Sequence, residues 1–180
     1  MMKPVCIIPA RGGSKGLPRK NVLPLCGHPL LSWTVIAAVE ALGNESVFVT
    51  TDDEEIVSVA ERYGARVIRR PAELAGDTAT SESALEHALC EVRARDGHLP
   101  EAFVFVQATS PLTTSADIRL AIERLEEAGV DSLFSGVRSH RFLWRYDDLG
   151  DARGINHDSR ERLRRQDRDP EVAENGAIYV

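Results

Sequence analysis

The chain has 180 residues, of which 43% are hydrophobic and 28% are charged, and its formal net charge at pH 7 is −6. This length is enough for one domain with a hydrophobic core. The acidic balance argues against a nucleic-acid-binding protein, and no apolar run approaches the roughly 20 residues of a membrane-spanning helix.

The three cysteines, Cys6, Cys26 and Cys90, are scattered and form no CxxC pair. This pattern argues against a disulfide framework and against a zinc site. We expect two of the three to be small core residues, and we expect the protein to reside in a reducing cytoplasm.

Short apolar segments alternate with longer amphipathic segments over the first three quarters of the chain. Two of the helices are expected to begin with capping boxes, one from Ser83 to Glu86 and one from Thr114 to Asp117. The predicted strands cover residues 5–8, 46–51, 65–69, 102–107 and 131–137, and the predicted helices cover 29–42, 53–63, 83–94 and 114–128.

This alternation predicts an α/β fold, a doubly wound and mostly parallel sheet with helices on both faces. The segment AFVFVQ at 102–107 is hydrophobic on both faces, as a strand buried on both sides should be. Residues 138–174 are polar and lack periodicity, whereas NGAIYV at 175–180 predicts another strand. We therefore expect a single domain over 1–180 with an excursion from the sheet at 138–174. An apolar strand at the last residue also predicts that the protein continues beyond residue 180.

A basic, glycine-rich loop follows the first predicted strand. The stretch PARGGSKGLPRKN at 9–21 contains three glycines and the basic residues Arg11, Lys15, Arg19 and Lys20. Ligands of open α/β sheets bind beyond the carboxyl ends of strands, and backbone N–H groups of such a loop can surround an anion. The loop therefore predicts a polyphosphate site, with a solvated basic turn as the alternative. It has neither the GxxxxGK[ST] nor the GxGxxG spacing.

Four stretches, in order along essentially the whole chain, resemble motifs of the acylneuraminate cytidylyltransferases, also called CMP-sialic acid synthetases. They are IIPARGGSKGLPRKN at 7–21, RPAELAGDTATS at 70–81, QATSPLTTSADI at 107–118 and RRQ…ENGAIYV at 164–180. The resemblance implies a Rossmann-like nucleotidyltransferase that uses Mg²⁺. Such an enzyme transfers CMP from CTP to the anomeric hydroxyl of a nine-carbon 2-keto sugar acid, a nonulosonic acid, and releases pyrophosphate.

The resemblance also assigns the nucleotide-binding residues. Arg11, Lys15 and Lys20 are expected to be catalytic, because fixed cations stabilise the charge that develops on departing pyrophosphate. Lys15 is expected to be the most rate-critical. Asn21 is expected beside the cytosine, and a turn or helix-cap asparagine is the alternative. The full nucleotide set is Arg11, Gly12, Gly13, Ser14, Lys15, Lys20, Asn21, Arg70 and Ser81.

For the sugar acid, the resemblance implies Gln107, Thr109, Ser110, Arg145 and Arg165. Arg165 is expected to hold the substrate carboxylate, which a guanidinium fork fits well. Without the resemblance, residues 109–111 would be interpreted as a plain turn. The neighbouring arginines, at 160, 162, 164 and 168, are expected to be solvated or paired with Glu161, Asp167 and Asp169.

The excursion is also expected to mediate a homodimer, with Phe142 and Trp144 on its surface. The chain departs from the family pattern in two ways. Ala173 stands where some members have an arginine, and the family's two metal-associated aspartates would lie beyond residue 180, so the metal ligands stay unknown. Asp52 and Asp53 are interpreted as the acidic start of a helix rather than as metal ligands.

Three alternatives remain. A cytidylyltransferase for the eight-carbon keto acid of lipopolysaccharide is disfavoured because its loop typically resembles SxRLPGKPL, whereas this chain has SKGLPRKNV. A catalytically silent, regulatory CTP-binding module is suggested by the absent aspartates. A nicotinamide-dependent dehydrogenase is a weak alternative, because it requires a GxGxxG turn and an acid after the second strand, and only the acid is present. No nucleic-acid or membrane partner is expected.

Overall fold

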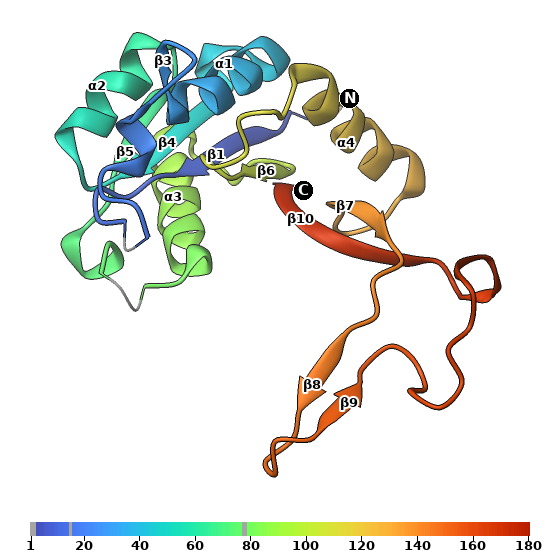
Figure 1. Ribbon diagram of the computed structural model, residues 1–180. Helices are drawn as coiled ribbons and strands as arrows, with labels where there is room; N and C mark the ends of the chain where they lie inside the picture. The colour runs from blue at the N-terminus through green and yellow to red at the C-terminus, as the bar shows by residue number, and fades with distance from the viewer. Residues whose placement is uncertain (1–2, 15, 77–78) are drawn as a thin grey trace. The chain divides into compact units, whose positions relative to one another are not determined.

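A computed structural model describes residues 3–14, 16–76 and 79–180 (Figure 1). The chain divides into two compact units. Residues 1–135 and 176–180 form the sheet unit, and residues 136–175 form the excursion unit. None of the described helices is both long and apolar enough to cross a membrane.

A six-stranded sheet is the frame of the molecule. Its strands are Val5–Pro9 (β1), Val47–Thr51 (β4), Arg66–Arg69 (β5), Phe103–Val106 (β6), Phe134–Ser139 (β7) and Glu171–Tyr179 (β10). The order is β5-β4-β1-β6-β10-β7. β1 pairs in parallel with β4 and β6, β4 pairs in parallel with β5, and β10 runs antiparallel to β6. The predicted mostly parallel sheet is confirmed.

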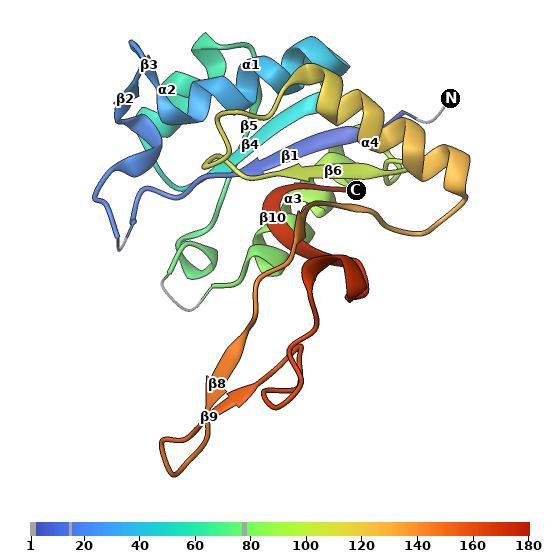
Figure 2. The ribbon, with the colours of Figure 1, turned by 45° about the vertical axis from the view of Figure 1, so that its right-hand side comes forward.

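The helices cover both faces of this sheet, as a doubly wound fold requires. They are Leu30–Leu42 (α1), Glu54–Arg62 (α2), Ser81–Asp96 (α3) and Ser115–Ala128 (α4). α1, α2 and α4 lie on one face and α3 lies on the other (Figure 2). The short elements of the sheet unit are Pro24–Leu25 (β2), His28–Pro29 (β3), Lys20–Val22 (η1), Asn44–Ser46 (η2) and Ala72–Leu74 (η3).

Local capping explains where the helices begin. The Asp53 carboxylate accepts hydrogen bonds from the backbone N–H groups of Glu55 and Ile56, so α2 starts directly after β4. The capping box predicted between Thr114 and Asp117 is confirmed at the start of α4.

The capping box predicted from Ser83 to Glu86 is wrong. Thr80 is the N-cap of α3, and its hydroxyl accepts the N–H of Ser83 at 3.2 Å. α3 therefore begins at Ser81, two residues earlier than predicted. The reason is that the preceding threonine supplies the same acceptor as Ser83 and adds another half-turn of helix.

The core lies between the central strands and α1. β1 and β4 are buried on both faces, and Leu31 and Val35 of α1 are fully inaccessible to solvent. Of the cysteines, only Cys6 is buried, so the prediction of two core cysteines is wrong by one. Burial raises the pKa of the Cys6 thiol to about 12, which keeps it protonated.

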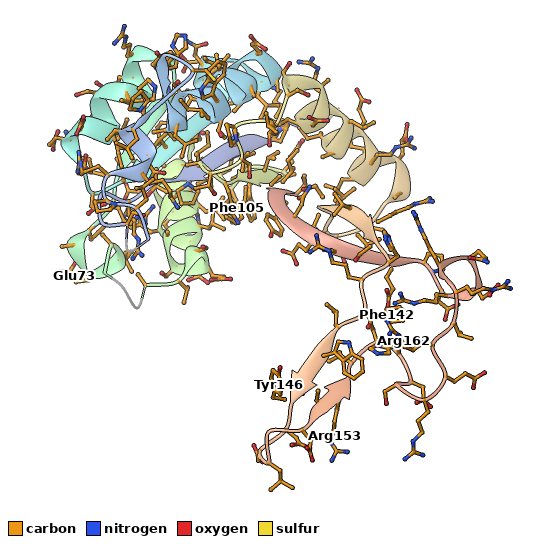
Figure 3. The ribbon with its side chains drawn as sticks, viewed as in Figure 1. Glu73, Phe105, Phe142, Tyr146, Arg153 and Arg162 are labelled. Atoms are coloured by element: carbon orange, nitrogen blue, oxygen red, sulfur yellow. The ribbon has the colours of Figure 1, made fainter. Side chains whose placement is uncertain are left out.

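β6 departs from the prediction of a strand buried on both sides. Val104 and Val106 are buried, whereas Phe103 and Phe105 are only half-buried. Alternate side chains of a strand face opposite sides of the sheet, and the face that carries Phe105 is incompletely covered. Figure 3 shows Phe105 on the α3 side of β6.

The excursion unit has no buried residue along its whole length, 136–175. Besides the end of β7 and the start of β10, its regular elements are a two-stranded hairpin, Trp144–Tyr146 (β8) and Ala152–Gly154 (β9), and a single 3-10 turn, Arg165–Asp167 (η4). The sequence analysis did not predict β8 or β9, because three-residue strands leave no detectable periodicity.

A polar and aromatic network joins the segments of the excursion unit. Arg168 donates 2.7 Å hydrogen bonds to the His140 carbonyl and to the Glu171 carboxylate, and it stacks on the Phe142 ring. Arg162 stacks on the same ring, 4.3 Å from its centroid (Figure 3). The prediction that Arg168 is solvated or paired with a nearer acid is wrong, because its side chain is only 9% exposed and pairs with Glu171.

Candidate functional site

A hollow of about 330 Å³ opens at the carboxyl end of the sheet in the sheet unit. The chain proceeds from β1 to β4 and β5 on one side, and β6 then joins β1 on the other side, so the strand order reverses between β1 and β6. Ligands of doubly wound folds bind at such a reversal. Several predicted site residues line the hollow: Arg11, Gly13, Ser14, Lys20, Asn21, Arg70, Ser81, Gln107 and Thr109.

The loop after β1 forms one wall of the hollow. The Arg11 guanidinium donates a 3.0 Å hydrogen bond to the Gly76 carbonyl, which ties this wall to the segment after β5. The buried Asn21 amide donates to the Arg11 carbonyl at 3.1 Å and so closes the loop at its mouth. Lys15 lies outside the described residues.

Arg70, directly after β5, supplies a buried positive charge to the hollow. It is 9% exposed, and Nη2 donates a 2.7 Å hydrogen bond to the carbonyl of Thr50 on β4. Burial lowers the pKa of Arg70, and the nearby charge of Asp52 opposes this effect. Arg70 forms no ion pair with any described residue, so a ligand with acceptor oxygens would complete its environment.

The start of α3 also lines the hollow. Thr80 and Ser81 line the hollow, and Ser81 is the first residue of the helix. N–H groups at the first turn of a helix carry partial positive charge and can receive a ligand acceptor. The corrected start of α3 therefore brings Ser81 to a helix terminus instead of leaving it in a loop.

The floor is formed by the end of β6 and the residues after it. The Thr109 hydroxyl donates to Gln107 Oε1 at 3.3 Å, which orients the amide. Gly176 on the returning strand has φ +70°, and a Cβ there would lie 3.2 Å from Gln107 Nε2. Ser110 donates its backbone N–H to the Gln107 carbonyl in a turn and does not line the hollow.

The acidic pair after β4 serves local structure. Asp52 accepts the backbone N–H of Gly12 at 3.1 Å, and Asp53 caps α2 and pairs with Arg19. The hydrogen bond from Arg19 holds the pKa of Asp53 below its ordinary range. The interpretation as a helix start is confirmed for Asp53, whereas Asp52 bonds the loop. Across the described residues, no group of three or more His, Cys, Asp or Glu side chains could hold a metal ion.

Arg145 and Arg165 belong to the excursion unit. Arg165 lines a separate hollow of about 200 Å³ together with Arg138, His140 and Arg168. Arg145 lies on β8 opposite Arg153 of β9 and does not line that hollow. Within this unit the two predicted sugar-acid residues are therefore not brought together.

Sequence reasoning missed part of the lining. Leu74, Thr80, Ala84 and Phe105 also face the hollow. A signal for Phe105 was available, since the aromatic residues of β6 occupy alternate positions and the valines occupy the others. Ala84 could be found only once the start of α3 was known.

The sequence matches the family described as Cytidylyltransferase over residues 5–163. Among curated proteins, it is 38% identical over 97% of its length to N-acylneuraminate cytidylyltransferase of Oncorhynchus mykiss, covering 40% of that protein. It is 39% identical over 99% of its length to the enzyme of the same name of Streptococcus agalactiae serotype III (strain NEM316), covering 43% of it. The chain thus spans about 40% of the length of these relatives.

Two solved structures share the fold. CMP:2-keto-3-deoxy-manno-octonic acid synthetase complexed with CTP aligns with a TM-score of 0.69 at 20% identity, over 98% of this chain and 73% of that one. The 4-diphosphocytidyl-2C-methyl-D-erythritol synthase of Anaerococcus prevotii DSM 20548 aligns with a TM-score of 0.63 at 12% identity, over 98% and 70%. With the sequence match over most of its length, the chain belongs to the cytidylyltransferase family.

Proposed function

We propose that this chain carries the nucleotide site of an enzyme that transfers CMP from CTP to the anomeric hydroxyl of a nine-carbon 2-keto sugar acid. The observation that carries the proposal is the hollow at the strand-order reversal, where Arg11, Lys20 and the buried Arg70 converge. The names of the curated relatives support the nine-carbon class over the eight-carbon class. The eight-carbon name of one structural neighbour carries no weight on substrate, since that likeness is at 20% identity.

In the proposed reaction, the anomeric hydroxyl oxygen attacks the α-phosphorus of CTP. A new P–O bond forms, the bond between the α-phosphorus and the bridging oxygen breaks, pyrophosphate leaves, and the hydroxyl proton is released. Arg11 and Lys20, with Lys15 assigned by resemblance, stabilise the charge that grows on the departing phosphates. The backbone N–H groups of Gly13 and Ser14 are further donors, whereas the N–H of Gly12 is already bound to Asp52.

We assign the remaining polar residues to the cytosine base and to the sugar acid. Asn21 uses Nδ2 to hold the loop, and we propose that its Oδ1 accepts a hydrogen bond from the cytosine amino group. We propose that Gln107 and Thr109 bind hydroxyl or acylamino groups of the sugar acid and that Arg165 binds its carboxylate. Ser110 and Arg145 remain predictions from the resemblance, as does the cytoplasmic location.

Mg²⁺ is implied by the resemblance, and such an ion would neutralise phosphate charge. The described residues do not fit a Mg²⁺ site, because they include no group of three or more His, Cys, Asp or Glu side chains that could hold an ion, and Asp53 is bound to α2 and Arg19. We therefore derive no step through the metal.

Pyrophosphate release with CTP and Mg²⁺, across a panel of nonulosonic acids and the eight-carbon acid, tests the proposal. Release that requires CTP and one nine-carbon acid is the expected result. Release with the eight-carbon acid alone would correct the substrate class. CTP binding without release from any acid would contradict the catalytic proposal and favour the silent binding module.

We also propose that the excursion unit mediates a homodimer. Trp144, Tyr146 and Leu149 of its hairpin are 45%, 78% and 87% exposed, an apolar group that a partner surface would cover. Light scattering after size exclusion should give twice the chain mass for the wild type and the chain mass for Tyr146→Ser. A monomeric wild type at micromolar concentration would contradict the proposal.

A further inference from the structure

The loop between Arg11 and Lys20 is fastened at both ends to one acidic corner of the sheet unit, the corner formed by Asp52 and Asp53. At the first end, the Gly12 N–H donates to Asp52 Oδ1 at 3.1 Å. A Cβ on Gly12 would stand 2.5 Å from Asp53 Oδ2 and 3.0 Å from Asp53 Cβ. Only glycine permits this approach, so the loop backbone lies directly against the two carboxylates.

The other end of the loop returns to the neighbouring carboxylate, that of Asp53. Arg19 adopts a left-handed backbone conformation with φ 60°, and its guanidinium donates to both carboxylate oxygens of Asp53. It also donates to Glu55, the second residue of α2. Arg19 is therefore engaged by acids, and it is not among the residues that line the hollow.

The corner itself is well fixed. Asp53 Oδ1 accepts the N–H groups of Glu55 and Ile56 at 3.0 and 3.1 Å, and the Asp53 N–H donates to the Thr51 hydroxyl at 3.2 Å. Asp53 thus links the end of β4, the start of α2 and the loop. Its position is set by the sheet and not by the loop.

We infer that Asp53 is a positioning residue that holds the phosphate-facing loop through Arg19, while its neighbour Asp52 holds Gly12 at the other end. This inference rests on the proposed function for what the loop binds, although the fastening itself does not. A loop of this length with free ends would lose conformational entropy when a polyphosphate orders it, and fastening both ends removes part of that loss beforehand. Asp53 should therefore matter for ligands that carry phosphates and not for the nucleoside.

The test compares CTP with cytidine as probes, by calorimetric titration of the 180-residue chain. Asp53→Asn keeps a side chain of the same shape that can still cap α2, but it removes the charge that holds Arg19. We expect CTP binding to weaken by about five- to tenfold and cytidine binding to stay within about twofold. Equal weakening of both ligands, or of neither, would overturn the inference.

A matched control and a double variant sharpen the test. Glu54 neighbours Asp53 on α2 and pairs with Arg69, away from the loop. Glu54→Gln should leave CTP binding unchanged. Arg19→Gln should reproduce the effect of Asp53→Asn, and the double variant should be no worse than either single variant. Additive losses in the double variant would show that the two residues act separately and would overturn the inference.

Backbone hydrogen exchange separates this inference from the proposed function. The amides of the loop should exchange faster in Asp53→Asn than in the wild type without any nucleotide, while the amides of α2 keep their protection. If the wild type binds no CTP and the loop still loosens in the variant, the proposed function fails and the fastening stands. If loop exchange is unchanged, the fastening fails whatever the chain binds.

Discussion

The sheet unit and the excursion unit are each stabilised internally by different interactions. The sheet unit has a conventional core in which β1, β4 and α1 bury aliphatic side chains completely. The excursion unit has no buried residue, and Arg168, Glu171, Asn156 and Phe142 hold its segments through hydrogen bonds and stacking. Burial of apolar area stabilises a fold without directional demands, whereas a polar network stabilises it only when every partner is present.

This difference teaches where function can tolerate change. A packed core fixes the positions of the strands that line the hollow of the sheet unit. The backbone that carries its polar side chains is therefore held in place. Arg165 sits on a single 3-10 turn beside the arginine network of the excursion unit. We therefore expect loss of one network residue to disturb Arg165 far more than loss of one surface residue disturbs the nucleotide site.

The largest expected effect on stability comes from a substitution in the core of the sheet unit. Leu31→Ala should lower the free energy of unfolding by about 3 kcal/mol, because Leu31 is fully buried and the surroundings can close the cavity only in part. Urea denaturation followed by circular dichroism measures this. Leu163→Ala, at a 49% exposed position of the excursion unit outside the proposed dimer surface, is the control and should cost no more than about 1 kcal/mol. Similar losses in both variants would refute the contrast between the units.

The second-largest expected effect is a loss of stability that is confined to the excursion unit. Arg168→Ala removes two charge-assisted hydrogen bonds and a ring contact, and it should destabilise this unit by about 2 kcal/mol. Hydrogen exchange should rise across 139–143 and 156–171 and stay unchanged in β1 and β4. Arg160→Ala, at an exposed position, should alter neither region. Faster exchange in β1 would mean that the two units unfold together.

The third prediction concerns pH and the acidic corner of the sheet unit. Arg19 holds the pKa of Asp53 below its ordinary value of 3.8, so the charged form stabilises the folded state. This contribution is fully present above that ordinary value and is lost as the pH falls through the lower, folded-state pKa. The wild type should therefore lose more stability than Asp53→Asn between about pH 4 and pH 2. Parallel melting curves for the two proteins across this range would contradict the ion pair.

The smallest expected effect is a stabilisation. Cys26 and Gly27 join β2 to β3 with φ of 50° and 85°, a turn in which asparagine is favoured at the first position. Cys26→Asn should raise the free energy of unfolding by about 0.5 kcal/mol, because it relieves backbone strain. Cys90→Asn, in the exposed part of α3, is the control and should not stabilise. An equal gain in both variants would point to loss of a thiol rather than to the turn.

The sequence by itself determined the architecture and most of one wall of the site. The apolar segment at 5–8 and the β-branched segment at 46–51 indicate strands buried on both faces, as in a parallel sheet covered by helices. The glycines and basic residues after β1 indicated a phosphate-binding loop because ligands gather at the carboxyl ends of strands. The threonine and aspartate at 114 and 117 specified the start of α4 locally, and the structure agrees.

Only the tertiary structure decided which of these charges face the hollow. Arg11 and Arg19 look equivalent in the loop sequence, yet one lines the hollow and the other is paired with Asp53, 34 positions along the chain. The burial of Arg168 was equally invisible, since it depends on which distant segment covers the residue. Periodicity and turn chemistry report on neighbours in sequence, whereas ion pairing and burial report on neighbours in space.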